Sequence, residues 1–151
     1  MSNHIFVSYS RRDSNMLAKI ASLLEKDGFE VWTDNNLVAG TPSWKNAIEQ
    51  AIQDCFCVVI LMSPGSKKSE WVERELDYAY ILKKRIFPVL VDGSAQSAIP
   101  FELINIQYVD LRVDFDDQFD SLCDAIRLYQ ESNPLAYPKP ENSNQFFDLD
   151  L

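Results

Sequence analysis

The sequence predicts an α/β protein in which helices cover both faces of a parallel β-sheet. Apolar runs typical of strands alternate along the chain with segments whose apolar residues recur at helical spacing. One of these runs, CVVILM at 57–62, contains no charged residue, which suits a strand that is buried on both faces. Such alternation implies right-handed β-α-β units and therefore parallel strands. At 151 residues the chain is long enough to form one domain with a substantial core.

The first half of the chain has clear signals for helix ends. Asp13 or Ser14 is placed to cap a helix at its start, and Gly28 suits the left-handed position just after the end of that helix. The loop that follows the second strand, TDNNLVAGTPS, is long for a connection of this type. The elements expected in this half are a strand at 4–9, a helix after residue 13, a strand at 29–32, a loop at 33–43 and a helix at 44–54.

In the second half, the sequence SPGS at 63–66 interrupts the apolar strand, and Ser69 is a candidate N-cap for the next helix. A tail at 132–151 differs in composition, because three prolines and a polar stretch precede its closing FFDLDL. We expect a domain over 1–131 and a loosely ordered tail. The other elements expected are a strand at 57–62, a helix up to residue 82, a strand at 86–91, a loop at 92–103, a weak strand at 107–111 and a helix at 115–129.

Composition and charge exclude several classes of function. The chain carries 23 acidic and 14 basic side chains and a net charge of −9, which argues against nucleic acid as its main partner. No apolar stretch reaches the roughly 18 residues of a membrane-spanning helix, and the start of the chain does not read as a secretory signal. The three cysteines show no metal-ligand spacing and are expected to be small core residues. We therefore expect a cytoplasmic protein without membrane contact.

Common catalytic motifs are also missing. Neither the dinucleotide fingerprint GxGxxG nor the phosphate-binding GxxxxGK[ST] occurs. His4 is the sole histidine and stands at the start of the first strand, which disfavours a Ser-His-Asp triad or a zinc site. A phosphorelay receiver would need an acidic cluster after the first strand, where this chain has Ser10-Arg11-Arg12-Asp13. No metal and no cofactor is expected.

One carboxylate lies where an ordinary surface charge would not. On a helical wheel of about 100° per residue, Glu75 falls within an apolar face formed by Trp71, Val72, Leu76, Ala79 and Leu82. Glu73, Arg74 and Asp77 point away from that face. One interpretation is structural: Glu75 pairs with an arginine, or its carboxylate is solvated at the rim of the face. The other is that Glu75 is a catalytic carboxylate held beside an aromatic ring.

The topology brings three segments to one cleft. Ligands of parallel sheets bind beyond the carboxyl ends of the strands, where 8–13, 33–43 and 63–75 would meet. Cleavage of an N-glycosidic bond to a pyridinium suits these residues, because the leaving group departs neutral and needs no general acid. A carboxylate would stabilise the oxocarbenium-like charge, an aromatic face would stack the pyridinium, and arginines would hold a pyrophosphate. Trp32 and Trp44 are expected to serve packing rather than stacking.

Four segments together resemble a Toll/interleukin-1 receptor (TIR) domain of the bacterial, NAD-cleaving type. They are HIFVSYSRRD at 4–13, GFEVWTDNNLVAGTPSW at 28–44, VVILMSPGSKKSEWVERELDYA at 58–79 and KRIFPVLVD at 84–92. The resemblance implies a flavodoxin-like, doubly wound sheet of five parallel strands with helices on both faces. It also implies self-association through the loop at 33–43.

The resemblance further implies an activity and a site. In family members that hydrolyse NAD+, the catalytic glutamate closes a W-x-x-x-E pattern, which here is Trp71 to Glu75. We therefore expect an NAD+ glycohydrolase that produces nicotinamide and ADP-ribose or a cyclic isomer, in antiphage defence or signalling. The alternative is a non-catalytic adaptor that acts only through TIR–TIR assembly. Besides NAD+ and other TIR domains, a sensor domain or another protein is a candidate binding partner of this chain. The residues expected to bind the substrate are Tyr9, Ser10, Arg11, Arg12, Asp34, Gly40 and Trp71.

Overall fold

The computed structural model describes residues 4–34, 37 and 43–132. Its sheet holds five parallel strands in the order β2-β1-β3-β4-β5, as the doubly wound prediction requires. The strands are β1 (Ile5–Ser8), β2 (Val31–Trp32), β3 (Cys57–Met62), β4 (Arg85–Leu90) and β5 (Val109–Asp110). The helices are α1 (Ser14–Lys26), α2 (Trp44–Asp54), α3 (Pro64–Lys67), α4 (Glu70–Ile81), α5 (Ala95–Ala98) and α6 (Phe115–Ser132), and the 3-10 turns are η1 (Arg11–Asp13) and η3 (Phe101–Leu103).

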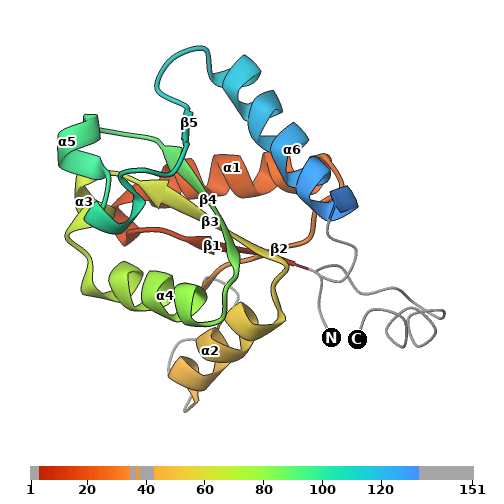
Figure 1. The fold of residues 1–151 in the computed structure, drawn as a ribbon, viewed down its shortest axis with the longest axis vertical. Coiled ribbons are helices and arrows are strands. Elements are labelled where there is room, and N and C mark those ends of the chain that lie inside the picture. Colours follow the sequence, from red (N-terminus) through yellow and green to blue (C-terminus); the bar gives the residue numbers. More distant parts are fainter. Residues whose placement is uncertain (1–3, 35–36, 38–42, 133–151) are drawn as a thin grey trace.

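Two apolar cores lie on opposite faces of the sheet. Figure 1 shows α1 and α6 above the sheet and α2 and α4 below it. Alternate residues of β3 supply the two cores: Val59 and Leu61 pack toward α1 and α6, whereas Val58 and Ile60 pack toward α2 and α4. All residues of β3 are buried, which explains the unbroken apolar run in the sequence. Among the helices of the described residues, none has the length and apolar character that crossing a bilayer needs.

Several predicted boundaries are confirmed and others are corrected. The helix at 44–54 and the strand at 57–62 have the expected bounds, and Gly28 has φ +97° directly after α1. The second and fifth strands are shorter than predicted, with two residues each. The expected loop at 92–103 contains α5 and η3, and the turn at 63–66 begins α3. In α3 and in α5, two serines three residues apart cap each other's backbone N–H. This is a local signal that the sequence analysis missed.

The prediction of a tail at 132–151 lies almost entirely outside the described residues. Helix α6 continues to Ser132, one residue beyond the expected end of the domain.

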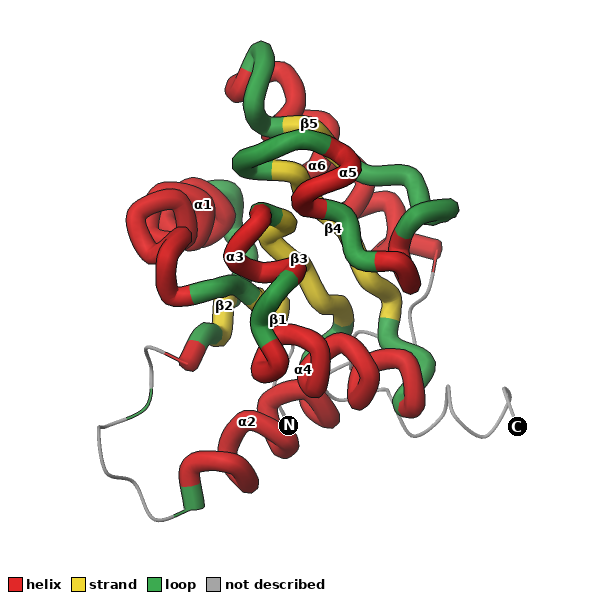
Figure 2. Tube along the Cα trace, turned by 90° about the vertical axis from the view of Figure 1, so that its left-hand side faces the viewer, coloured by secondary structure: helices red, strands yellow, loops and turns green. Residues whose placement is uncertain are grey.

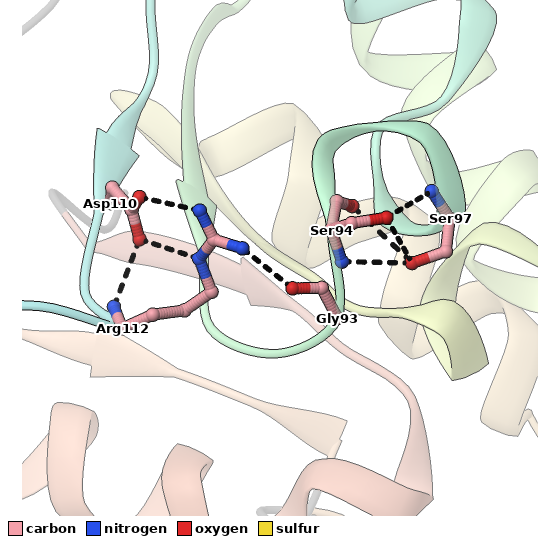
Figure 3. A network of polar contacts seen from close by, with 5 residues as sticks. All are labelled: Gly93, Ser94, Ser97, Asp110 and Arg112. Atoms are coloured by element: carbon pink, nitrogen blue, oxygen red, sulfur yellow. Dashed lines mark hydrogen bonds and ion pairs between the residues drawn. The ribbon is translucent and has the colours of Figure 1, made fainter.

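The carboxyl ends of the strands form one edge of the molecule, which faces the viewer in Figure 2, with α3 and α5 beside it. Polar contacts join the loops at this edge. Arg112 donates to the Asp110 carboxylate through Nε and Nη2 at 2.9 and 2.8 Å, and to the Gly93 carbonyl at 2.6 Å (Figure 3). Gly93 has φ +82°, and a Cβ there would lie 2.8 Å from Pro64. Glycine is therefore needed where the loop after β4 crosses the start of α3.

Candidate active site

Glu75 is buried against the end of the first strand. The side chain of Ser69 caps α4 by accepting from the Val72 backbone N–H at 3.1 Å, and this sets the helix so that Glu75 points inward. Ser8, the last residue of β1, donates its hydroxyl to Glu75 Oε1 at 2.7 Å. Only 7% of Glu75 is exposed to solvent, whereas Glu73, Arg74 and Asp77 are exposed, as the helical wheel predicts.

Burial sets the protonation state of Glu75. Desolvation raises the pKa of this carboxyl to about 8, and the negative charge of Asp34 acts in the same direction. The Ser8 hydroxyl and the nearby Trp71 indole lower the pKa without reversing the effect of burial. Within the described residues no arginine or lysine forms an ion pair with Glu75. The interpretation of Glu75 as the partner of an arginine is therefore not supported.

Asp34 connects the ends of the first two strands. Its carboxylate accepts from the Tyr9 hydroxyl at 2.7 Å and lies 3.3 Å from Arg11 Nη2. Burial and the hydrogen bond to Asp34 raise the pKa of Tyr9, so this hydroxyl stays protonated and acts as a donor. The Arg11 side chain is 72% exposed and remains accessible to an anion.

The turn after β1 packs closely against the turn after β3. Ser10 accepts from the Arg12 backbone N–H at 3.3 Å and so holds the arginine pair in η1. A Cβ at Gly65 would lie 3.1 Å from Ser10 Oγ, so glycine permits this close approach. Asp13 occupies the N-cap position of α1 but makes no side-chain capping bond. Its carboxylate instead accepts from Ser63, which corrects the expected capping role.

Two tryptophans stack beside Glu75. The indoles of Trp44 and Trp71 have ring centroids 4.7 Å apart and an interplanar angle of 19°. Trp71 Nε1 is buried and has no hydrogen bond of ordinary length among the described residues, but its N–H acts on the Glu75 carboxyl and lowers the pKa of that group. Trp32 stacks on Phe6 with centroids 5.3 Å apart, in agreement with the expected packing role.

Two cavities meet at Trp71. The larger, of about 430 Å³, is lined by the predicted substrate residues Tyr9, Ser10, Arg11, Arg12, Asp34 and Trp71, together with Trp44 and Ser69. The smaller, of about 320 Å³, lies between α2 and α4. Besides Trp71 and Glu75, its lining comprises the apolar and aromatic residues Ile48, Ile52, Tyr78 and Ile81 and the charged residues Lys45, Glu49, Arg74 and Asp77. The fold thus gathers six of the seven predicted substrate residues, and it places Glu75 behind Trp71 in the adjoining cavity. Gly40 lies outside the described residues.

Two residues of this site were not predicted to have a role in it: Ser8 was named only as part of the cleft segment 8–13, and Trp44 was expected to serve packing. Ser8 is the polar residue of HIFVSY that shares a sheet face with the core residue Phe6, so the alternation of the strand was a usable signal. Trp44 had no comparable signal, because its contact with Trp71 joins two different helices. His4 is buried and pairs with the Ala51 carbonyl at 2.7 Å. In the part of the chain that the structure describes, no group of side chains could hold a metal ion.

Comparisons with known proteins agree on one family. A family model described as "TIR domain" matches residues 5–123. A relative from Methanobrevibacter olleyae, described as the probable 2′ cyclic ADP-D-ribose synthase TcpO, is 26% identical over 102 residues. The match covers 65% of this chain and 30% of TcpO, so the chain spans less than a third of that relative's length.

Solved structures of TIR domains have the same fold. The TIR domain of the Toll-related receptor TRR-2 from Hydra magnipapillata aligns with a TM-score of 0.71 and 20% identity over 83% of this chain and 99% of that chain. The TIR domains of the activated Roq1 resistosome align with a TM-score of 0.67 and 17% identity over 83% and 99%. A TIR-STING receptor from C. gigas aligns with a TM-score of 0.68 and 25% identity over 82% and 39%. Because the family model spans most of its length, the chain belongs to the TIR domain family.

Proposed function

We propose that this TIR domain cleaves NAD+ at the bond between nicotinamide and ribose. The observation that carries the proposal is Glu75, a buried carboxyl without an ion-pair partner among the described residues, held by Ser8 at the carboxyl ends of the strands. A pKa raised to about 8 marks a group whose burial opposes its charge, as is common for working carboxylates. The relative named as a cyclic ADP-ribose synthase supports the same class of chemistry.

The chain's own residues divide the steps of this reaction between them. The bond from ribose C1′ to the pyridinium nitrogen breaks with its electron pair on the nitrogen, so nicotinamide leaves neutral. Positive charge develops on the ribose, and ionised Glu75 stabilises it. A cationic substrate beside Glu75 lowers the pKa of the carboxyl and so favours the ionised form when it is needed. Water or a nucleophile within the substrate then adds to C1′ and loses a proton, which gives ADP-ribose or a cyclic isomer.

Binding is assigned to the larger cavity. Arg11 and Arg12 are exposed and line it together, which suits contact with a pyrophosphate. Asp34 orients Arg11 and Tyr9 by accepting from both. Trp71 offers an aromatic face next to Glu75 for the pyridinium ring.

Self-association belongs to the same proposal. One of the solved structures with a similar fold contains the TIR domains of the activated Roq1 resistosome. We assign assembly of this chain to the loop at 33–43, most of which lies outside the described residues, and we place the activity in cytoplasmic defence or signalling. A sensor domain or partner protein would then supply the activating signal.

The direct test is to incubate the purified protein with NAD+ over a range of protein concentrations and to separate the products by chromatography. Nicotinamide release is expected from the wild type, and Glu75→Gln should reduce the rate by about 10² to 10³-fold, as loss of one preorganised group does. Glu73→Gln is the matched control, because the neighbouring carboxylate is exposed and should leave the rate unchanged. Assembly without nicotinamide release at any concentration would favour the adaptor function instead.

A further inference from the structure

The Trp44–Trp71 stack lies where the two cavities of the site share a lining residue. Trp71 lines both cavities, Trp44 lines only the larger one with Arg11 and Arg12, and Glu75 lines only the smaller one. If the proposed function holds, a single substrate must reach the arginines and Glu75 at the same time. Trp71 is the lining residue that the two cavities share, and Trp44 stacks on it.

The spacing of the two indoles leaves no room for a substrate ring. A flat ring held between two others needs a van der Waals contact of about 3.5 Å on each side, or a separation of roughly 7 Å between the outer rings. The centroids of Trp44 and Trp71 are 4.7 Å apart. The face of Trp71 that Trp44 covers is therefore closed to a pyridinium in this conformation.

Trp44 has fewer local restraints than Trp71. Trp71 lies in the first turn of α4, which Ser69 caps, and its Nε1 atom is buried. Trp44 is the first residue of α2, whose N-cap Ser43 makes no side-chain capping bond. The buried anchors of α2 lie one or more turns later, at Ile48, Ala51 and Ile52. Trp44 itself is only partly buried at the edge of this core, so rotation of its side chain would leave the buried anchors of α2 in place.

The Trp71 indole is held in place through Glu75. Its buried N–H has no hydrogen bond of ordinary length among the described residues, but it acts on the Glu75 carboxyl and lowers the pKa of that group. Rotation of Trp71 would remove this interaction from a buried carboxyl. Of the two stacked indoles, Trp71 is therefore the one that should stay in place.

We propose that Trp44 is a gate that occupies the pyridinium-binding face of Trp71 and must swing away before a nicotinamide ring can bind. The inference rests on the proposed function and adds a residue that governs access for the ring. An aromatic pair contributes about 0.5–1.5 kcal/mol beyond the area it buries, and this stabilisation is lost when the substrate displaces Trp44. Removing the indole should thus tighten ring binding by about two- to tenfold.

The test measures binding without turnover. Calorimetric titrations of the Glu75→Gln protein compare NAD+ with ADP-ribose, which retains the pyrophosphate and lacks the pyridinium. Adding Trp44→Ala should lower the Kd for NAD+ by about two- to tenfold and leave the Kd for ADP-ribose unchanged. Trp44→Leu, which keeps apolar bulk without a flat ring, should behave in the same way and covers the case in which the alanine variant folds poorly. Trp32→Phe is the control, because Trp32 packs on Phe6 in the core.

Each remaining outcome overturns the gate. Weaker NAD+ binding in both Trp44 variants would mean that the Trp44 indole itself stacks on the nicotinamide ring. An equal gain for NAD+ and ADP-ribose would mean that Trp44 is only a wall of the cavity. If the wild type cleaves NAD+ and the Trp44 variants bind it no more tightly, the gate alone fails. If the wild type releases no nicotinamide and no variant binds NAD+, the proposed function fails and the gate fails with it.

Discussion

Glu75→Gln should make the protein more stable at neutral pH, even though the same change should remove its activity. The substitution keeps the size of the side chain and an oxygen that can accept from the Ser8 hydroxyl, a bond that is 2.7 Å long in the structure. It removes only the ability to ionise in a site where Glu75 is 7% exposed. A functional carboxyl that opposes its own burial should therefore reduce the stability of the fold.

The magnitude follows from proton linkage. In the unfolded chain the carboxyl titrates near its ordinary pKa of 4.5, and burial raises the pKa in the folded protein to about 8. The contribution of Glu75 to the free energy of unfolding is complete below pH 4.5, where the carboxyl is protonated in both states. It falls as the pH rises from 4.5 through 8, because over this range the unfolded state has released the proton and the folded state still holds it. At pH 7, which lies about 2.5 pH units above 4.5, the loss is roughly 3 kcal/mol at about 1.36 kcal/mol per unit.

The assay is thermal and urea denaturation of the wild type and Glu75→Gln from pH 4 to pH 9. The two proteins should have similar stability near pH 4, and the variant should gain progressively to roughly 3 kcal/mol at pH 7. For a domain of this size, that gain corresponds to a Tm difference on the order of 5–10 °C. Comparing the two proteins at each pH cancels the titration of every other group.

Glu73→Gln is the matched control, because Glu73 is exposed on the same helix and should show no pH-dependent difference. Parallel stability curves for the wild type and Glu75→Gln across this range would refute the reasoning. Glu75 would then be ionised and solvated in the folded protein, and its raised pKa would not be available to the proposed chemistry.

Three further predictions concern activity. Ser8 donates to Glu75 and lowers the pKa of that carboxyl. If kcat/KM rises with pH as Glu75 ionises, Ser8→Ala should shift this rise to higher pH. An unchanged pH profile would exclude this role. Arg11→Ala and Arg12→Ala should raise KM for NAD+ more than they lower kcat, because the pyrophosphate is remote from the bond that breaks, and a fall in kcat alone would contradict the assignment. Specific activity should rise with protein concentration, and Gly40→Arg should suppress that rise while the Tm stays unchanged. Constant specific activity over a hundredfold dilution, in both the wild type and the variant, would mean that one chain holds a complete site.

Periodicity and local capping signals determined most of the fold. The unbroken run of β3, the helical spacing of α2 and α4 and the glycine after α1 depend on contacts or conformations within a few residues. The short elements were less predictable. Strand β2 has only two residues, and α5 is one turn held by Ser94 and Ser97, so neither extends far enough to establish a period. The extent of β2 depends on its pairing with β1, whereas α5 depends on the local serine pair, a signal that periodicity does not reveal.

The sequence by itself also identified Glu75, because a carboxyl on an apolar helix face is visible from spacing alone. Only the tertiary structure decided its surroundings. It placed Ser8 against the carboxyl across a separation of 67 residues, joined Tyr9 to Asp34, and stacked Trp44 on Trp71. It also left Asp13, one of the two expected caps, at the N-cap position of α1 but directed its carboxylate to the Ser63 hydroxyl. These contacts arise where the ends of parallel strands converge, and that convergence depends on strand order and packing, which local sequence patterns do not encode.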